Sequence, residues 1–261
     1  MLPALSIILI VSICETGSAK RSSSGGNRWG IPNDGLWCKD AKPKGAEKRK
    51  SDSDEQPFAS TIYNVPRQGV TPNFRAAVTL NGTGLIGPQG DMKVTYNNSR
   101  PQKNVDRNGE PCAGKVGAVA GSAGICLTPF FTVAADPRYY SIGDVICIPE
   151  IENGSKKLEV PLTRGEKKTH SGCFIVADKG SAIKGENRFD FFTGTAPEKG
   201  NPLTDFADKK SCNQKFQVYR AGSEEATKRM NAIDKLWDME EGSLAKRYQN
   251  AGSSRRVARR R

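Results

Sequence analysis

Residues 173–194 read CFIVADKGSAIKGENRFDFFTG, and this stretch decides the fold. Its first part is an apolar run that ends at Asp178 before a Gly-Ser turn, which predicts a strand with a carboxylate at the rim of a sheet. Its last part places Asp190 inside an aromatic strand. Because side chains alternate along a strand, the phenylalanines directly beside Asp190 point away from it, while Arg188 and Phe192 share its face. The stretch therefore predicts two strands that each carry an aspartate.

The surroundings of these aspartates suggest acid chemistry. A carboxyl group in partly apolar surroundings and near a second carboxylate tends to have a raised pKa, so Asp190 can stay protonated as a general acid. Gly180 and Gly185 allow the backbone to approach a ligand or the other carboxylate closely. Taken alone, however, Asp178 before a glycine turn has the pattern of a turn cap, and Asp136 before a proline has the pattern of a structural turn.

Short runs of β-branched and aromatic residues recur along the middle of the chain, separated by Gly, Pro and Asn. No long helical period interrupts them, which favours a β-barrel or β-sandwich. The runs predicted as strands are 60–63, 76–80, 130–133, 144–148, 173–176 and 216–219.

Changes in composition divide the chain into five segments. Before the strand-rich region lie an apolar leader that ends in small residues and then a polar stretch with few large apolar anchors. After it, apolar residues recur at helical spacing behind Ser223-Glu224-Glu225, which predicts the start of a helix. We predict a secretory signal peptide at 1–19, a flexible polar arm at 20–56, a β domain at 57–220, an amphipathic helix at 221–248 and a disordered Arg-rich tail at 249–261.

The charge of the chain is concentrated at its ends. The 261 residues include 40 Lys and Arg against 28 Asp and Glu, a net charge of +12, which suggests a polyanionic partner. Residues 244–261 carry seven basic and no acidic side chains, whereas residues 57–243 carry 24 basic and 21 acidic ones. The nearly balanced middle argues against a nucleic-acid groove. Only the stretch 2–13 is apolar enough to enter a bilayer, which excludes a multi-span membrane protein.

Seven cysteines and one histidine limit the metal chemistry of the chain. No CxxC pair is present, and His170, which we expect at the rim of the sheet, is the only imidazole, which argues against a zinc site. Cys14 falls in the leader, which leaves an even number of cysteines in an exported chain and predicts disulfides. Cys112 and Cys126 bracket a Gly/Ala-rich loop and are the predicted pair; the other pairings stay open. The disulfide candidates are Cys38, Cys112, Cys126, Cys147, Cys173 and Cys212.

Three motifs in a fixed order carry a resemblance to a known family. They are AxDPxxxxxG at 134–143, DxGxAIKG at 178–185 and RxD at 188–190. This pattern resembles the 3D domain, named for three aspartates, of the double-psi β-barrel superfamily, and the stretch 61–63 resembles its opening TxY strand. The same domain forms the catalytic barrel of MltA-type lytic transglycosylases of bacterial cell walls. The resemblance implies a six-stranded double-psi β-barrel over residues 57–220.

The resemblance also implies a function and roles for individual residues. Asp190 falls on the transglycosylase catalytic aspartate, with Asp178 as its partner and Asp136 as the third motif aspartate. The implied reaction cleaves the β-1,4 bond between N-acetylmuramic acid and N-acetylglucosamine and forms a 1,6-anhydro product, with no metal or cofactor. The partner would be peptidoglycan or a related cell-wall glycan, bound by a secreted or periplasmic monomer. Candidate substrate-binding residues are Thr61, Tyr63, Asp136, Ser181, Lys184 and Arg188.

Two departures from the family pattern support an alternative. In the second motif Lys179 and Ser181 replace the usual Thr and Gly. The space between Leu80 and Phe130 is also too short for the second substrate-clamping domain of the larger enzymes. The alternative is a non-catalytic module of the same barrel that binds or loosens the cell wall. A third hypothesis, nucleic-acid binding by the Arg-rich tail, lacks aromatic residues interleaved with the basic ones.

Overall fold

The computed structural model describes residues 60–248 apart from short gaps. The gaps are residues 88, 113–116, 162–165, 181–182, 197–199, 208–210, 212–213 and 238–241. The predicted signal peptide (1–19), polar arm (20–56) and basic tail (249–261) lie outside the described residues, as do Cys38, Ser181 and Cys212. What was inferred for those residues stays a prediction.

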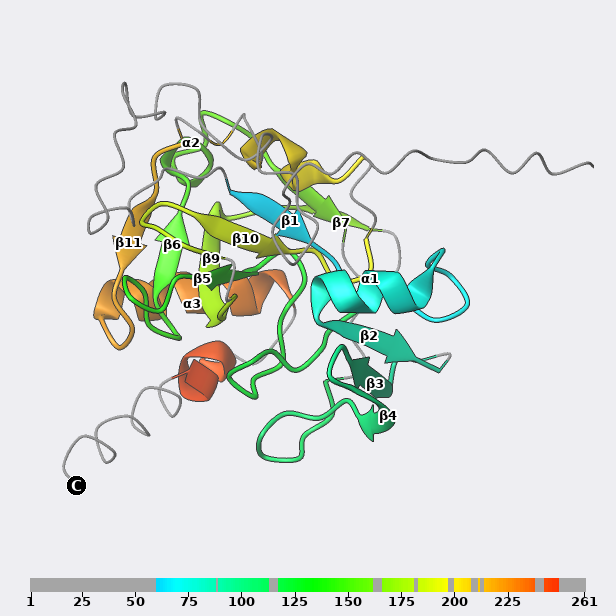
Figure 1. Ribbon diagram of the computed structural model, residues 1–261. Helices are drawn as coiled ribbons and strands as arrows, with labels where there is room; N and C mark the ends of the chain where they lie inside the picture. The colour runs from blue at the N-terminus through cyan, green and yellow to red at the C-terminus, as the bar shows by residue number, and fades with distance from the viewer. Residues whose placement is uncertain are drawn as a thin grey trace, which may run out of the picture.

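A mixed sheet of six strands forms the centre of the fold (Figure 1). Across the sheet the strands are β1 (Thr61–Tyr63), β10 (Phe189–Phe192), β5 (Thr132–Ala135), β9 (Cys173–Asp178), β6 (Val145–Cys147) and β11 (Gln217–Tyr219). The pairs β1–β10 and β5–β9 are parallel, and the other neighbours are antiparallel. The predicted mainly β class is confirmed. Among the described residues no pairing joins β1 to β11, so closure into a barrel is not confirmed.

Continuous apolar runs form this sheet because its central strands are buried on both faces. All residues of β5 and β6 are buried, as are all residues of β9 before Asp178. Phe174 on β9 and Phe191 on β10 meet edge to face, with ring centroids 4.8 Å apart. Every run predicted as a strand overlaps a strand of this sheet, except 76–80.

The run 76–80 is helical, so the prediction of a strand there was wrong. It lies in α1 (Phe74–Asn81). Its two alanines favour a helix, and Val78, the residue that the helix buries, packs closely over Gly84. Gly82 ends the helix with φ at 83°, a conformation that glycine adopts without strain.

A small antiparallel sheet follows α1. It lies in the Gly/Asn/Pro-rich region between Leu80 and Phe130, for which no strand was predicted. Figure 1 shows this sheet and α1 to one side of the six-stranded sheet. Its last strand is polar and mostly exposed, so it lacks the apolar alternation by which strands are recognised. The strands are β2 (Thr83–Ile86), β3 (Met92–Thr95) and β4 (Asn98–Lys103).

The C-terminal region is two helical segments rather than the single helix predicted over 221–248. The first, α3 (Glu224–Leu236), begins where predicted, because Ser223 accepts a hydrogen bond from the Ala226 amide. The second covers residues 243–248 and follows Gly242, whose φ is 81°. None of the helices among the described residues is long and apolar enough to cross a membrane. The remaining elements are α2 (Pro149–Glu152), β7 (Glu159–Pro161), β8 (Lys167–Thr169) and the 3-10 helix η3 (Pro202–Phe206).

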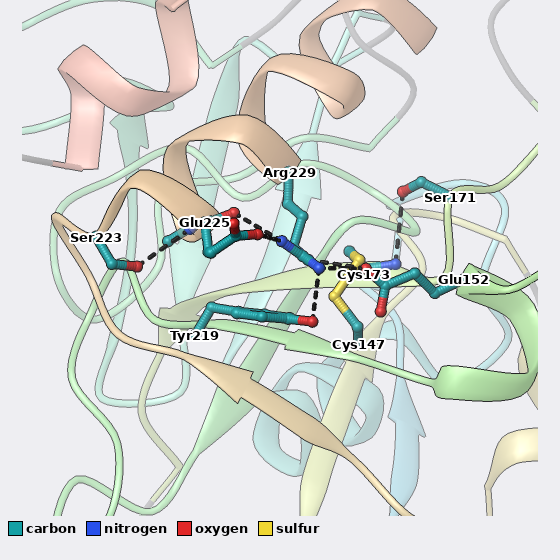
Figure 2. Close-up of polar contacts among 9 residues, drawn as sticks. Cys147, Glu152, Ser171, Cys173, Tyr219, Ser223, Glu225 and Arg229 are labelled. Atoms are coloured by element: carbon teal, nitrogen blue, oxygen red, sulfur yellow. Dashed lines mark hydrogen bonds and ion pairs between the residues drawn. A yellow bond between two sulfur atoms is a disulfide. The ribbon is translucent and has the colours of Figure 1, made fainter.

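Arg229 connects α3 to neighbouring elements through hydrogen bonds and ion pairs (Figure 2). Its guanidinium bonds to Glu152 after β6, to Glu225 one turn earlier on α3, and to the Tyr219 hydroxyl, at 2.5 to 2.8 Å. The same guanidinium lies 3.5 Å from the centroid of the Tyr219 ring. A half-buried arginine with two carboxylate partners and a phenol holds the helix against β11 and α2.

Two disulfides lie within the described residues. Cys112–Cys126, the predicted pair, is confirmed, with Cα atoms 5.3 Å apart. Cys147–Cys173, which the sequence left open, joins directly opposite residues of β6 and β9. Figure 2 shows this second disulfide beside Arg229. The first bridge therefore closes a loop, whereas the second lies within the main sheet.

His170 lies in the core, not at the rim where the sequence analysis expected it. Its ring is 2% exposed and stacks between Phe131 and Phe174. Nε2 lies 2.9 Å from the Phe130 carbonyl oxygen, and Nδ1 accepts a hydrogen bond from the Gly172 amide. This pair of contacts suits a neutral ring with its proton on Nε2. Burial lowers the pKa of His170 to about 3, although the bond to Phe130 opposes the shift.

We predict that this histidine makes the fold less stable in mild acid. Its pKa is lower in the folded state than the unfolded value of about 6.5, so only the unfolded chain takes up the proton as the pH falls below that value. Between pH 6.5 and 5 the free energy of unfolding should fall by about 2 kcal/mol. Urea titrations at both pH values measure the change.

The matched variant is His170→Gln, which cannot titrate. Its free energy of unfolding will be lower than that of the wild type at pH 7, because the core is altered. Its change between pH 6.5 and 5 should nevertheless be about 2 kcal/mol smaller than in the wild type. Equal changes in the two proteins would contradict the prediction, since the chain has no other histidine.

Candidate active site

The two predicted catalytic aspartates lie in one row across the main sheet. Thr61 on β1 is opposite Asp190 on β10, Asp190 is opposite Ala134 on β5, and Ala134 is opposite Asp178 on β9. Residues directly opposite one another on paired strands project to the same face. With neighbouring strands about 4.8 Å apart, the Cα atoms of the two aspartates are separated by roughly 10 Å. The small side chain of Ala134 lies between them.

An irregularity in the pairing of β5 with β9 places Asp178 on this face. Val133 is opposite Val176, but the next residue, Ala134, is opposite Asp178, so Ala177 is skipped. Such a bulge reverses which side of the sheet the following side chain points to. Without it, Asp178 and Asp190 would lie on opposite faces.

Asp190 is half-buried and is oriented by Thr61. The Thr61 hydroxyl donates a 2.8 Å hydrogen bond to Oδ1 of Asp190. Phe189 and Phe191, its neighbours along β10, are fully buried on the other side of the strand. Arg188 precedes them and is 5% exposed; burial lowers its pKa, and the charge of Asp190 opposes that shift. Asp190 therefore combines apolar surroundings with partial access to solvent.

Tyr63 bonds to Asp178 and is influenced by the charge of Asp190. It follows Thr61 by two residues on β1 and therefore shares its face. Its hydroxyl donates to Oδ2 of Asp178 over 3.3 Å. Burial, then the charge of Asp178 and then that of Asp190 raise the pKa of Tyr63 well above its usual value. The phenol therefore keeps its proton and remains a hydrogen-bond donor at neutral pH.

Ser122 is a site residue that the sequence analysis missed. Its amide and hydroxyl both donate to Oδ1 of Asp178, at 2.8 and 2.5 Å, and the Lys179 amide donates to the same oxygen at 2.9 Å. The sequence predicted the disulfide between Cys112 and Cys126 that closes this Gly/Ala-rich loop. The sequence held no signal for which strand the loop would meet.

Asp136 joins two of the motifs from within the fold. Its carboxylate is fully buried, forms a salt bridge of 2.8 Å with Arg138, and accepts a hydrogen bond from the Gly185 amide. Burial by itself would raise the pKa of Asp136, but these bonds and the charge of Arg138 lower it to about 2. A glycan cannot reach this carboxylate, so Asp136 is not in a substrate-binding position.

The other predicted substrate-binding residues divide by exposure. Thr61 and Tyr63 contact the two aspartates directly, as described above. Lys184 is exposed and accessible to a ligand. It precedes Gly185, whose amide bonds to Asp136. Arg188 is buried and supports β10 from within. Only three of these candidates among the described residues are therefore available for direct contact with a substrate.

A second residue missed by the sequence analysis is Tyr248, in the helical segment 243–248. The side chain is 2% exposed, and its hydroxyl has no hydrogen-bond partner among the described residues. Burial raises the pKa of Tyr248, and the charge of Asp178 adds to this shift. The C-terminal segment therefore contributes a buried, neutral phenol in the neighbourhood of Asp178.

Comparison with known proteins confirms the resemblance stated from the motifs. Residues 131–203 match the family model of the 3D domain. A crystal structure of MltA from E. coli, described as a unique lytic transglycosylase fold, is 23% identical over 38% of this chain and 24% of its own, with a TM-score of 0.22. A variant of E. coli lytic transglycosylase MltA in an apo form is 19% identical over 46% and 28%, with a TM-score of 0.23. The chain thus spans about a quarter of these structures. No curated protein matches it.

We predict that Asp136 is a stabilising residue. Asp136→Ala leaves the buried amide of Gly185 without its acceptor and should lower the free energy of unfolding by about 3 kcal/mol. The matched control is Asp106→Ala, which removes a carboxylate that bonds two amides in an exposed loop and should cost less than about 1 kcal/mol. Urea denaturation at pH 7 compares the two. A cost below 1 kcal/mol for Asp136→Ala would show that this carboxylate does not hold the motifs together.

Proposed function

We propose that this protein is a secreted peptidoglycan lytic transglycosylase, with Asp190 as its general acid and base. The observation that carries the proposal is the position of Asp190. It lies half-buried inside a 3D-domain motif, bonded to Thr61, and shares a sheet face with Asp178 across Ala134.

The first step is protonation of the leaving group. Oδ1 of Asp190 accepts the hydrogen of Thr61, so a proton held by the neutral acid sits on Oδ2. Asp190 gives this proton to the oxygen of the β-1,4 bond between N-acetylmuramic acid and N-acetylglucosamine. The bond from C1 to that oxygen breaks, and N-acetylglucosamine leaves with a free hydroxyl. Positive charge develops on the muramoyl ring.

In the second step the same residue acts as a base. The carboxylate of Asp190 removes the proton from the C6 hydroxyl of the muramoyl residue, and the C6 oxygen attacks C1. A 1,6-anhydro ring forms, Asp190 regains its proton, and no water is consumed. One carboxyl group suffices for both transfers, unlike in two-carboxylate hydrolases, where a second carboxylate acts as nucleophile or base.

Asp178 supports this chemistry from across Ala134. Its oxygens accept bonds from Ser122, Lys179 and Tyr63, which fix its orientation. A carboxylate held in this way stabilises oxocarbenium-like charge in the transition state or orients Asp190. We place Thr61, Tyr63 and the exposed Lys184 along the glycan groove.

The fold and location follow from the same proposal. The six-stranded sheet corresponds to the double-psi β-barrel of 3D domains, and the protein acts as a monomer outside the cytoplasm. The two disulfides suit an oxidising compartment. Their presence supports the prediction of export from the N-terminal leader.

The decisive experiment uses purified sacculi. The mature protein should release anhydromuropeptides, identified by mass spectrometry, and Asp190→Asn should lower the release rate about 100-fold or more, because the amide cannot transfer the proton. The control is Asp106→Asn, the same chemical change in an exposed loop, which should act at the wild-type rate.

Three outcomes separate the candidate functions. Binding to sacculi without release would replace the enzyme with a wall-binding or wall-loosening module. Products with an added water at the reducing end would identify a hydrolase. Full activity of Asp190→Asn would remove Asp190 from the reaction and contradict the proposal.

A further inference from the structure

The contact between Ser122 and Asp178 links two parts of the chain that are far apart in sequence. Ser122 lies outside residues 131–203, the region that matches the 3D domain, yet it supplies two of the hydrogen bonds that Asp178 accepts. The Ser122 hydroxyl also accepts a hydrogen bond from the Lys179 amide at 3.2 Å. Ser122 therefore contacts both the carboxylate and the first residue of the turn that follows it.

We propose that Ser122 is a positioning residue, which fixes the Asp178 carboxylate for the reaction of Asp190. The inference rests on the proposed function and adds to it a residue that the family motifs do not contain. Ser122 acts through Asp178, since its hydroxyl and amide both point at Oδ1 and leave Oδ2 to Tyr63.

The loop that carries Ser122 is held rigidly. Gly124 donates to the Gly121 carbonyl and Gly121 donates to the Ile125 carbonyl, which closes a tight turn around Ser122. Ala120 and Cys126 pair as an isolated bridge at the base of this turn, and the disulfide from Cys126 lies at the same point. A donor on so short and closed a turn has little freedom to leave its acceptor.

Asn104 connects this loop to the small sheet. Its side chain is 1% exposed and donates to the carbonyls of Gly90 and Ala118, while its oxygen accepts from the Ala120 amide. Each of these bonds is buried or half-buried, where loss of a partner is costly. The small sheet, Asn104 and the turn therefore act as one support for Ser122.

The close approach of the loop requires glycine at position 121. A Cβ atom there would lie 2.8 Å from Cδ2 of Leu127 and 3.1 Å from Oδ1 of Asp178. Contacts this short would force the turn away from the carboxylate. Gly121→Ala is thus a second, independent way to weaken the contact without touching Ser122.

The test compares three serine variants on sacculi. Ser122→Ala should lower kcat about tenfold with KM within twofold of the wild type, because the substrate groove is intact but Asp178 is less well oriented. Ser122→Thr keeps the hydroxyl and should restore kcat to within about threefold. Ser155→Ala, which removes an exposed loop hydroxyl with two similar hydrogen bonds, is the matched control and should equal the wild type.

The results divide clearly. Full kcat for Ser122→Ala, or a kcat for Ser122→Thr as low as that of Ser122→Ala, would overturn the inference. Gly121→Ala should lower kcat, as Ser122→Ala does. Thermal denaturation checks that the Gly121→Ala protein is folded.

Amide hydrogen exchange keeps this inference separate from the proposed function. In Asp178→Ala the Ser122 amide loses its acceptor and should exchange at least about tenfold faster than in the wild type. If the wild type releases no anhydromuropeptides but this exchange effect is present, the proposed reaction fails and the positioning of Asp178 by Ser122 stands. An unchanged exchange rate would overturn the positioning itself.

Discussion

The bulge in β9 opposite Val133 and Ala134 is the constraint on which the site depends. A regular parallel ladder would pair Ala134 with Ala177 and turn Asp178 to the face opposite Asp190. One skipped residue brings both carboxylates to the same face, with a small alanine between them. The contacts of Asp178 with Tyr63 and Ser122 are possible only after this reversal. A local departure from regular pairing thus determines which chemistry the sheet can support.

The site is built from parts that have little else in common. The main sheet supplies the two aspartates, while a disulfide-closed turn attached to the small sheet supplies Ser122. Asp136, buried in the turn after β5, contributes by accepting a hydrogen bond from the Gly185 amide. The bond from Gly185 to Asp136 is buried, where loss of a partner is costly, whereas the bonds from Ser122 to Asp178 lie at the surface. Asn104 thus connects the small sheet, which lies outside the 3D-domain match, to the turn that carries Ser122.

Patterns that are local in sequence predicted much of this structure, and contacts between distant segments account for what was missed. The strand around Asp190, the start of α3 and the Cys112–Cys126 bridge each follow from neighbouring residue types. The bulge at Ala177 does not, because its strand is uniformly apolar and gives no sign of which residue is skipped. The burial of His170 and the position of Ser122 depend on which surfaces meet. The run 76–80 was misread because alanine and valine fit both strand and helix, and only packing on Gly84 decides between them.

The bond between Thr61 and Asp190 joins residues 129 positions apart, through the parallel pairing of β1 with β10. Parallel strands separated by so much chain are slow to pair, because loop-closure entropy opposes them until most other contacts exist. Among the described strands β1 is the first to be synthesised, and it pairs with β10, one of the last. We therefore expect the bond between Thr61 and Asp190 to form late in folding, and a chain truncated before residue 190 would keep Asp178 but lack both Asp190 and the strand that pairs with β1.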